Sequence, residues 1–383
     1  MTRRQAGSRI ALLLGGCLLG LALAEVGLRA VGAFSPASFH LLPAHTRSRD
    51  VQTGWDVTYQ TNRVGWRDDD YTPAKPPGVT RVAVIGDSFT FGQGCERGEI
   101  FPDRLETLLR ERGENVQVLN LSTPGLGPEG YFVLLQGAAL AYQPDVVVLS
   151  VCANDASRVR PTPWLNEAVR RLSHRLRVFV LLREIRRRMA SPPADPWDVA
   201  AARGAPGPGL QEFLRKYGRA RTNLVAACLT DPAEVARWVD VPARGEGWGE
   251  FQRYVGAMVR LCRARGCRFV IAVVPDGAQV DPQQVDVRRL LGVPLAPDVL
   301  RAEGRFQGLV RDFARGQGAA FFDPLPDFRR AGGGLYFPID LHWTPAGHRL
   351  YAEALAGYLA AAPADGASGA ARPIIPPRTH PQE

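Results

Sequence analysis

The feature that most constrains the fold of this chain is a series of short apolar runs, separated by longer stretches of helical periodicity. The runs lie at 82–85, 116–121, 145–151, 268–274 and 319–322. Short apolar runs rich in β-branched residues favour buried strands, and complete burial is typical of parallel sheets. Strands that alternate with helices in this way form right-handed βαβ units. We therefore predict an α/β fold, a three-layer α/β/α sandwich around a mostly parallel sheet.

The intervening stretches predict helices at 101–112, 129–142, 251–265, about 300–315 and 345–361. In the first of these, Leu105, Leu108 and Leu109 share one face, as expected for an amphipathic helix. The last helix has Thr344 as a good N-cap and Pro345 at its first position.

Other segments are predicted to lie outside the sandwich. Residues 34–78 form an extended lead-in, in which the polar turn 61–67 is expected to cover one edge of the sheet. Residues 157–261 interrupt the α/β rhythm and predict a mostly helical insert. The Ala/Pro-rich tail, 362–383, is predicted to be disordered.

Within the insert, residues 170–189 form a basic helical stretch with an apolar stripe. The stripe consists of Leu172, Leu176, Phe179, Leu182 and Ile185. Such a helix most often caps a domain and leaves its arginine face in water. The alternative is contact with an anionic membrane surface.

Residues 1–33 have the pattern of an export segment, because basic residues precede an apolar run at 10–24. Cleavage after Ala24 would release a secreted protein. Alternatively, the helix continues through Glu25 and stays as an anchor, although a run of 15 residues is short for a full span. Both alternatives place the rest of the chain outside the cytoplasm. We predict a periplasmic protein held at the cytoplasmic membrane by one N-terminal helix.

Composition argues against a nucleic-acid partner. The 383-residue chain is 45% hydrophobic and 22% charged, as in an ordinary globular protein. Its net charge of +9 comes almost entirely from arginine, since Lys75 and Lys216 are the only lysines. No zinc-finger spacing or RNA-binding aromatic signature accompanies this charge. We therefore predict no nucleic-acid partner.

The cysteine pattern leaves disulfide pairing open. Five cysteines follow Cys17, and an odd number in an exported chain leaves at least one of them unpaired. Bridges between Cys262 and Cys267 or between Cys228 and Cys262 are both compatible with the sequence. No histidine lies near the cysteines at ligand spacing, so no metal site is predicted.

Polar residues with catalytic potential follow three of the predicted strands or precede the last helix. Ser88 follows the first strand, Gly125 the second and Asn154 the third. Asp340 and His342 directly precede the last helix. Because these edges converge on one crevice in a doubly wound sheet, we expect the residues to lie together.

This set contains what acyl transfer through serine requires: a nucleophile, a base oriented by an acid, and donors for the oxyanion. Ser88 is the predicted nucleophile, His342 the base, and Asp340 the carboxylate that orients the imidazole. The predicted oxyanion-hole donors are the Ser88 and Gly125 backbone N–H groups and the Asn154 side-chain amide. The pattern implies no metal ion and no organic cofactor.

These positions resemble the SGNH (GDSL-type) hydrolase superfamily, named for its catalytic Ser, Gly, Asn and His. The matching blocks are Gly86-Asp87-Ser88, Gly125, Asn154-Asp155, and Asp340 with His342. The resemblance covers 79–156 and 262–361 and implies a flavodoxin-like sandwich. The motif Asn62-x-x-Gly65-x-Arg67 and the N-terminal segment are similar to an exported or membrane-anchored bacterial branch.

One block departs from the family pattern. The usual Asp-x-x-His is replaced by Asp340-x-His342, and the order Asp-x-His-Trp resembles the alginate O-acetyltransferase-like branch. In that branch the Asp-His pair precedes the nucleophile, whereas here it follows. Asp323 is the alternative orienting carboxylate. His348 is the alternative base, although its place inside the last helix favours a packing role.

The resemblance implies a serine-dependent esterase for O-acyl or O-acetyl esters. The predicted location outside the cytoplasm makes cell-envelope glycan or lipid esters the expected substrate class. The insert is not a core feature of the family, and we expect it to set acyl-acceptor choice. Two alternatives remain: an O-acetyltransferase to an envelope polysaccharide, and a non-catalytic envelope-binding protein on the same fold. The glycine pattern at 125–130 does not favour a dinucleotide site, because Pro128 lies in the turn and no acidic residue ends the next strand.

Overall fold

The computed structural model describes residues 3–31, 41–157, 176–189, 195–203 and 207–361. These residues belong to two compact units. The first is Met1–Leu41 with Pro161–Pro193, and the second is Leu42–Arg160 with Ala194–Glu383. The predicted disordered tail and the first part of the basic stretch, 170–175, lie outside the described residues.

The second unit is built on a five-stranded sheet with the strand order β4-β3-β5-β6-β7. All neighbouring strands in it are parallel. The strands are β3 (Thr80–Gly86), β4 (Val116–Ser122), β5 (Val146–Val151), β6 (Arg268–Val273) and β7 (Ala320–Phe322). The predicted strands and the α/β fold with a parallel sheet are therefore confirmed.

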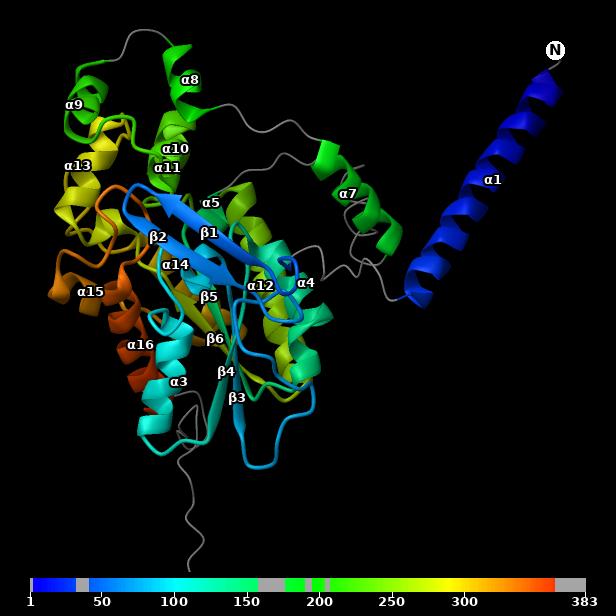
Figure 1. Cartoon of the computed structure of the whole chain (residues 1–383), viewed down its shortest axis with the longest axis horizontal. Helices are drawn as coiled ribbons and strands as arrows, with labels where there is room; N and C mark the ends of the chain where they lie inside the picture. The colour runs from blue at the N-terminus through cyan, green and yellow to red at the C-terminus, as the bar shows by residue number, and fades with distance from the viewer. Residues whose placement is uncertain (1–2, 32–40, 158–175, 190–194, 204–206, 362–383) are drawn as a thin grey trace, which may run out of the picture. The chain divides into compact units, whose positions relative to one another are not determined.

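Helices cover both faces of this sheet (Figure 1). One face carries α3 (Phe101–Glu111) and α16 (Pro345–Ala360), and the other carries α4 (Pro128–Gly137), α12 (Glu246–Ala264) and α14 (Arg305–Gln317). Successive strand residues point to opposite faces, so β3 contributes side chains to the core on both sides of the sheet. Val82 and Val84 share a core cluster with Leu105 and Leu355, whereas Ala83 and Ile85 are buried on the other side.

Shorter helices occupy the connections. They are α2 (Ser88–Phe91), α5 (Asn154–Ser157), α8 (Pro196–Ala201), α9 (Pro208–Tyr217), α10 (Asn223–Thr230), α11 (Pro232–Arg237), α13 (Pro282–Leu290), α15 (Leu325–Ala331), η2 (Ala139–Tyr142) and η3 (Gly277–Gln279). The stretch predicted as one helix at 129–142 is α4 followed by the 3₁₀ turn η2. The break falls at Ala138, just after Gly137, which is a poor helix former.

The lead-in contains a β-hairpin that the sequence pattern did not indicate. Strands β1 (Arg47–Gln52) and β2 (Trp55–Gln60) pair antiparallel. Trp55, Val57 and Tyr59 alternate with exposed or half-buried positions along β2 and pack in one apolar cluster with Phe91 and Phe337. The hairpin therefore belongs to the core of the second unit.

The segment after the hairpin reaches the free edge of β4 through Asp68. This residue directly follows the turn 61–67, which the sequence predicted to cover a sheet edge and whose Trp66 and Arg67 are buried. Strand β4 is the outermost strand, so some of its backbone N–H groups have no neighbouring strand to donate to. The Asp68 carboxylate accepts from the Asn120 N–H at 2.7 Å, and the Glu106 carboxylate of α3 accepts from the Val118 N–H at 2.5 Å. Side-chain oxygens thus replace a further strand.

The first unit contains α1 (Arg3–Ala30) and α7 (Arg177–Met189). Glu25 pairs with Arg29 at 2.7 Å, as their spacing predicted, and also accepts from the Val178 N–H at 3.0 Å, so it joins the two helices. Several leucines of α1 are exposed. None of the described helices has the length and apolar character that crossing a bilayer requires. The predicted anchor stays a prediction.

Two sequence-based expectations concern the insert and the cysteines. Residues expected in one helical insert at 157–261 are divided between the two units, and α8 to α12 belong to the unit that carries the sheet. All six cysteines are free thiols. Neither of the disulfides that the sequence left open, Cys262–Cys267 or Cys228–Cys262, is formed.

Candidate active site

The turn after β3 fixes Ser88 at the carboxyl edge of the sheet. Asp87 is the N-cap of α2, and its carboxylate accepts from the Phe89 N–H at 3.0 Å. Ser88 is therefore the first helical residue. Gly86 leaves no room for a side chain, because a Cβ there would lie 2.1 Å from the Thr90 hydroxyl oxygen. The sequence motif thus dictates a tight passage from strand to helix.

A continuous hydrogen-bond chain begins at Ser88. Its Oγ lies 2.7 Å from His342 Nε2, and His342 Nδ1 lies 2.5 Å from Asp340 Oδ1. Asp340 also accepts from the His342 N–H through the same oxygen at 3.0 Å. Because the carboxylate can only accept at Nδ1, it favours the tautomer that leaves Nε2 free to take the serine proton. The structure thus brings together the predicted nucleophile, base and orienting acid.

The second oxygen of Asp340 is held by the N-terminus of α10. Oδ2 accepts from the Asn223 N–H at 2.7 Å and from the Leu224 N–H at 3.3 Å. Burial by itself would raise the pKa of Asp340. The adjacent His342 imidazole and the N–H donors of His342 and Leu224 outweigh burial and lower this pKa below its usual range. Asp340 is therefore ionised at neutral pH.

The helix α2, which begins with Ser88, is also held from its other end, by Arg67 of the Asn62-x-x-Gly65-x-Arg67 motif. Its guanidinium is fully buried and donates to the carbonyls of Phe91 at 2.9 Å, Gly92 at 2.8 Å and Cys95 at 2.5 Å. These carbonyls lie at and beyond the C-terminal end of α2. The motif, which the sequence indicated only as a family resemblance, thus fixes the helix that carries Ser88.

Aromatic side chains pack against the His342 ring. The Trp55 ring stands edge-on to the His342 ring with centroids 6.3 Å apart, and the Phe89 ring lies 5.1 Å from it on another side. Ser88 is 9% exposed and His342 is 2% exposed. No sequence signal pointed to Trp55, because it comes from the lead-in hairpin.

The predicted oxyanion donors follow neighbouring strands. Gly125 lies in the turn after β4 with φ +75°, and Asn154 begins α5 after β5. Both strands flank β3, which ends at the Ser88 turn. The first residue of a helix has an N–H without a helical acceptor, and this residue is Ser88. Among the described residues, neither the Gly125 N–H nor the Asn154 amide has a hydrogen-bond acceptor.

A buried polar network connects the ends of β3 and β5. The Cys152 thiol lies 3.5 Å from an Asp87 oxygen, and the Cys152 N–H donates to Asp155 at 2.9 Å. The Tyr131 hydroxyl donates to Asp155 at 3.1 Å. Burial, with the nearby Asp87 and Asp155 carboxylates, raises the pKa of the Cys152 thiol, so it stays protonated and donates. This network was missed by sequence reasoning.

The alternative site residues lie elsewhere. His348 accepts from the Phe101 N–H at Nδ1 over 3.2 Å and is stacked on the Phe101 ring, so it packs α16 against α3. Asp323 accepts from the Leu325 N–H at 3.0 Å, at the start of α15. His342 is bonded to Asp340, so the unusual Asp-x-His spacing still brings carboxylate and imidazole together.

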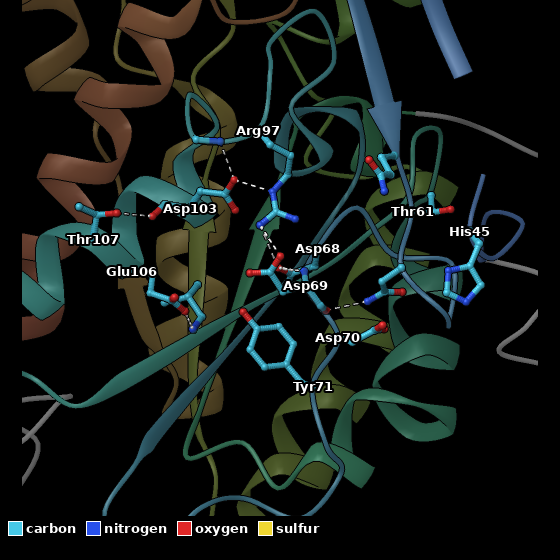
Figure 2. Close-up of a pocket in the computed structure, with 14 residues that line it drawn as sticks. His45, Thr61, Asp68, Asp69, Asp70, Tyr71, Arg97, Asp103, Glu106 and Thr107 are labelled. Atoms are coloured by element: carbon cyan, nitrogen blue, oxygen red, sulfur yellow. Dashed lines mark hydrogen bonds and ion pairs between the residues drawn. The ribbon is translucent and has the colours of Figure 1, made fainter. Parts of the chain in front are cut away.

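A separate pocket of about 710 Å³ lies beside the edge strand β4. Figure 2 shows Arg97 between Asp103 and the pair Asp68 and Asp69. Nitrogens of its guanidinium lie 2.8 Å from a carboxylate oxygen of Asp103, 3.5 Å from one of Asp68 and 3.6 Å from one of Asp69. None of the predicted catalytic residues lines this pocket. Two of its acids, Asp68 and Glu106, are those that accept from the edge-strand N–H groups, so their role in the fold is structural.

The fold and this site define an α/β/α protein that carries a Ser-His-Asp hydrogen-bond chain at the carboxyl edge of a parallel sheet. Two family models match consecutive parts of the chain. The GDSL-like lipase/acylhydrolase family matches residues 84–245, and the SGNH hydrolase-like domain of the acetyltransferase AlgX matches residues 238–374. The chain belongs to the SGNH (GDSL-type) hydrolase superfamily, a group of esterases and acyltransferases.

Several solved structures are similar to this chain. TesA shares 14% identity at a TM-score of 0.38 and covers 72% of this chain and 96% of its own. The acetyl xylan esterase AlAXEase shares 12% identity at a TM-score of 0.36, and the match covers 72% of this chain and 97% of the esterase. A catalytic mutant of the acetylxylan esterase Axe2 from Geobacillus stearothermophilus shares 14% identity at a TM-score of 0.38, and the match covers 72% of this chain and 92% of that esterase. No curated protein matches the chain.

Proposed function

We propose that the protein is a serine-dependent esterase that cleaves O-acyl esters through Ser88. The observation that carries this proposal is the unbroken chain of hydrogen bonds from Ser88 Oγ through His342 to Asp340. A binding protein has no need to keep three side chains in this order with these distances. The family, which contains esterases and acetyltransferases, supports the same reaction class.

In the proposed reaction, His342 Nε2 takes the proton from Ser88 Oγ as this oxygen attacks the ester carbonyl. The resulting oxyanion accepts hydrogen bonds from the Ser88 and Gly125 N–H groups and from the Asn154 amide. The tetrahedral intermediate then collapses, and His342 returns the proton to the departing alcohol. The acyl group stays on Ser88 until a hydroxyl attacks it, with His342 again acting as base. Asp340 keeps the imidazole oriented throughout.

The hydroxyl that releases the acyl group decides between hydrolysis and transfer. Water gives an esterase, whereas a sugar hydroxyl gives an O-acetyltransferase. The second candidate is favoured by the AlgX-type domain match, which spans Asp340 and His342. It is also favoured by the small exposure of Ser88, which limits the access of water. We propose cell-envelope glycan or lipid esters as the substrate class, on the grounds of the export-type N-terminal pattern alone.

The first test is acyl-enzyme formation by the full chain with p-nitrophenyl acetate. The Ser88→Ala and His342→Ala variants are compared with Ser48→Ala and His45→Ala, which change the same residue types at exposed positions. Fast steady turnover lost only in the first pair establishes an esterase. A burst followed by slow turnover, accelerated by added polysaccharide, indicates a transferase. Unchanged turnover in Ser88→Ala would refute the catalytic proposal and favour a binding protein.

The proposed location has its own test, since it rests on the N-terminal pattern. The chain is expressed in a Gram-negative host, and its membrane and soluble fractions are analysed by mass spectrometry. An anchored protein retains residues 1–24 and leaves the membrane only with detergent. A soluble product that begins at Glu25 would show the cleaved alternative instead.

A further inference from the structure

The loop that carries Asp340 and His342 is held by elements from outside the family motif. The Gln284 side chain of α13 donates to the carbonyls of Phe337 at 2.7 Å and Asp340 at 2.9 Å. Arg288 is fully buried, donates to Gln284 Oε1 at 2.7 Å and pairs with Asp276 at 3.1 Å. This network fixes the backbone of the loop. It does not touch the Asp340 carboxylate.

The carboxylate itself is held by α10, which lies in the segment expected to form the insert. Its two oxygens have different partners: Oδ1 faces His342, and Oδ2 accepts from the N–H groups of Asn223 and Leu224. A helix N-terminus offers free N–H donors and a positive dipole end, both of which suit an anionic acceptor. Any shift of α10 therefore moves the carboxylate relative to the imidazole.

Thr222 joins this helix end to the Asp340 loop. As the N-cap of α10, its Oγ1 accepts from the Val225 N–H at 3.2 Å. The same hydroxyl donates to the Ile339 carbonyl at 2.5 Å, one residue before Asp340. Thr222 is 3% exposed, so no water can replace either bond without rearrangement. One hydroxyl thus connects the donors of the carboxylate with the backbone that carries it.

We propose that Thr222 is a positioning residue for the reaction and that α10 belongs to the active site, where it holds the Asp340 carboxylate. This inference rests on the proposed function. It assigns to this part of the insert a role in aligning the orienting acid, where the sequence indicated only a role in acyl-acceptor choice. The competing explanation is that Thr222 caps α10 and contributes stability alone.

The test compares Thr222→Val, which keeps the size and removes the hydroxyl, with Thr222→Ser, which keeps the hydroxyl. Thr230→Val is the matched control, because Thr230 lies at the other end of the same helix and, among the described residues, its hydroxyl bonds only the Ala226 carbonyl. Thr222→Asn preserves an N-cap without the hydroxyl and serves if Thr222→Val does not fold. Active sites are counted by titration with a fluorophosphonate.

For Thr222→Val and Thr222→Asn we expect kcat per titrated site to fall roughly 10-fold or more, since misalignment of catalytic groups is costly, with KM little changed. Thr222→Ser and Thr230→Val should keep the wild-type kcat. The second readout is the low-field proton resonance of His342 Nδ1–H, which reports the bond to Asp340 without turnover. It should shift or broaden in Thr222→Val and remain in Thr230→Val.

A Thr222→Val protein with fewer titratable sites but an unchanged rate per site and an unchanged resonance would overturn the inference in favour of simple capping. The failure of the proposed function is a different outcome, in which wild type and Ser88→Ala turn over equally. In that case the His342 resonance alone still decides whether Thr222 aligns Asp340.

Discussion

His342 Nε2 lies 2.7 Å from Ser88 Oγ, although 254 positions separate the two residues in the chain. The contact exists because β3 ends in the turn before α2, while the loop before α16 returns to the same edge of the sheet. Neither residue is positioned by its neighbours in sequence alone.

The first prediction concerns which carboxylate orients His342. Asp340→Asn keeps the shape of the side chain but lets an amide face Nδ1, which favours the wrong tautomer. We expect kcat to fall by about 10³- to 10⁴-fold. Asp323→Asn is the control, because Asp323 bonds the Leu325 N–H and not His342. Equal losses in both variants, measured with p-nitrophenyl acetate, would contradict the assignment of Asp340.

The second prediction concerns Arg67, whose guanidinium donates to the carbonyls of Phe91, Gly92 and Cys95. A lysine ammonium at this place cannot reach the same acceptors with a planar fork, so buried acceptors lose their donor. We expect Arg67→Lys to lower the free energy of unfolding by about 2–3 kcal/mol. Arg63→Lys changes a half-exposed side chain and should lower the free energy of unfolding far less than Arg67→Lys, as measured by urea denaturation. A similar cost for both changes would mean that the buried contacts are energetically unimportant.

The third prediction concerns the packing of the hairpin on the active-site loop. At Gly94, with φ +88°, an added Cβ would lie 2.6 Å from the Phe337 ring and 3.0 Å from Trp55. Gly98 has φ +83° and open space around it, so it isolates the cost of the backbone conformation. We expect Gly98→Ala to lower the free energy of unfolding by about 1–2 kcal/mol through backbone strain. Gly94→Ala should lower it by about 1–3 kcal/mol more, because its side chain overpacks the site. Thermal unfolding that shows the same loss for both would refute this close packing.

The fourth prediction concerns pH. Burial, with the nearby Arg67 and His342, lowers the pKa of His348 to about 3, whereas an unfolded histidine has a pKa of about 6.5. Between these values the unfolded chain binds a proton that the folded chain does not. The contribution of His348 to stability is therefore complete above pH 6.5 and is lost as the pH falls, at up to about 1.4 kcal/mol per pH unit.

His348→Gln removes this titration and keeps an acceptor for the Phe101 N–H. Between pH 7 and pH 5 the wild type should lose about 2 kcal/mol more stability than the variant in urea denaturation. His45→Gln, at an exposed position, should follow the wild type. Parallel curves for wild type and His348→Gln would show that His348 does not titrate in this range.

The sequence by itself determined the strands of the parallel sheet, most of the helices and the order of the site residues. Strands such as β3 can be predicted from apolar runs such as Val82–Ile85, because a strand buried on both faces needs apolar residues at successive positions. Ser88, Gly125 and Asn154 could be placed because each follows a strand whose carboxyl end must reach one edge. The capping of α16 by Thr344 was equally local and is present.

Only the tertiary structure decided what surrounds these residues. Trp55 reaches His342 through a hairpin whose alternating pattern is short and whose partner surface comes from distant segments. The Thr222 hydroxyl donates to the carbonyl of Ile339, which lies 117 positions further along the chain, and no local periodicity predicts such a contact. Asp340 could be named from its spacing, but its ionisation depends on donors from α10 that fold to it from the insert. Local sequence specifies elements and their ends, whereas the environment of a buried charge is set by packing between elements.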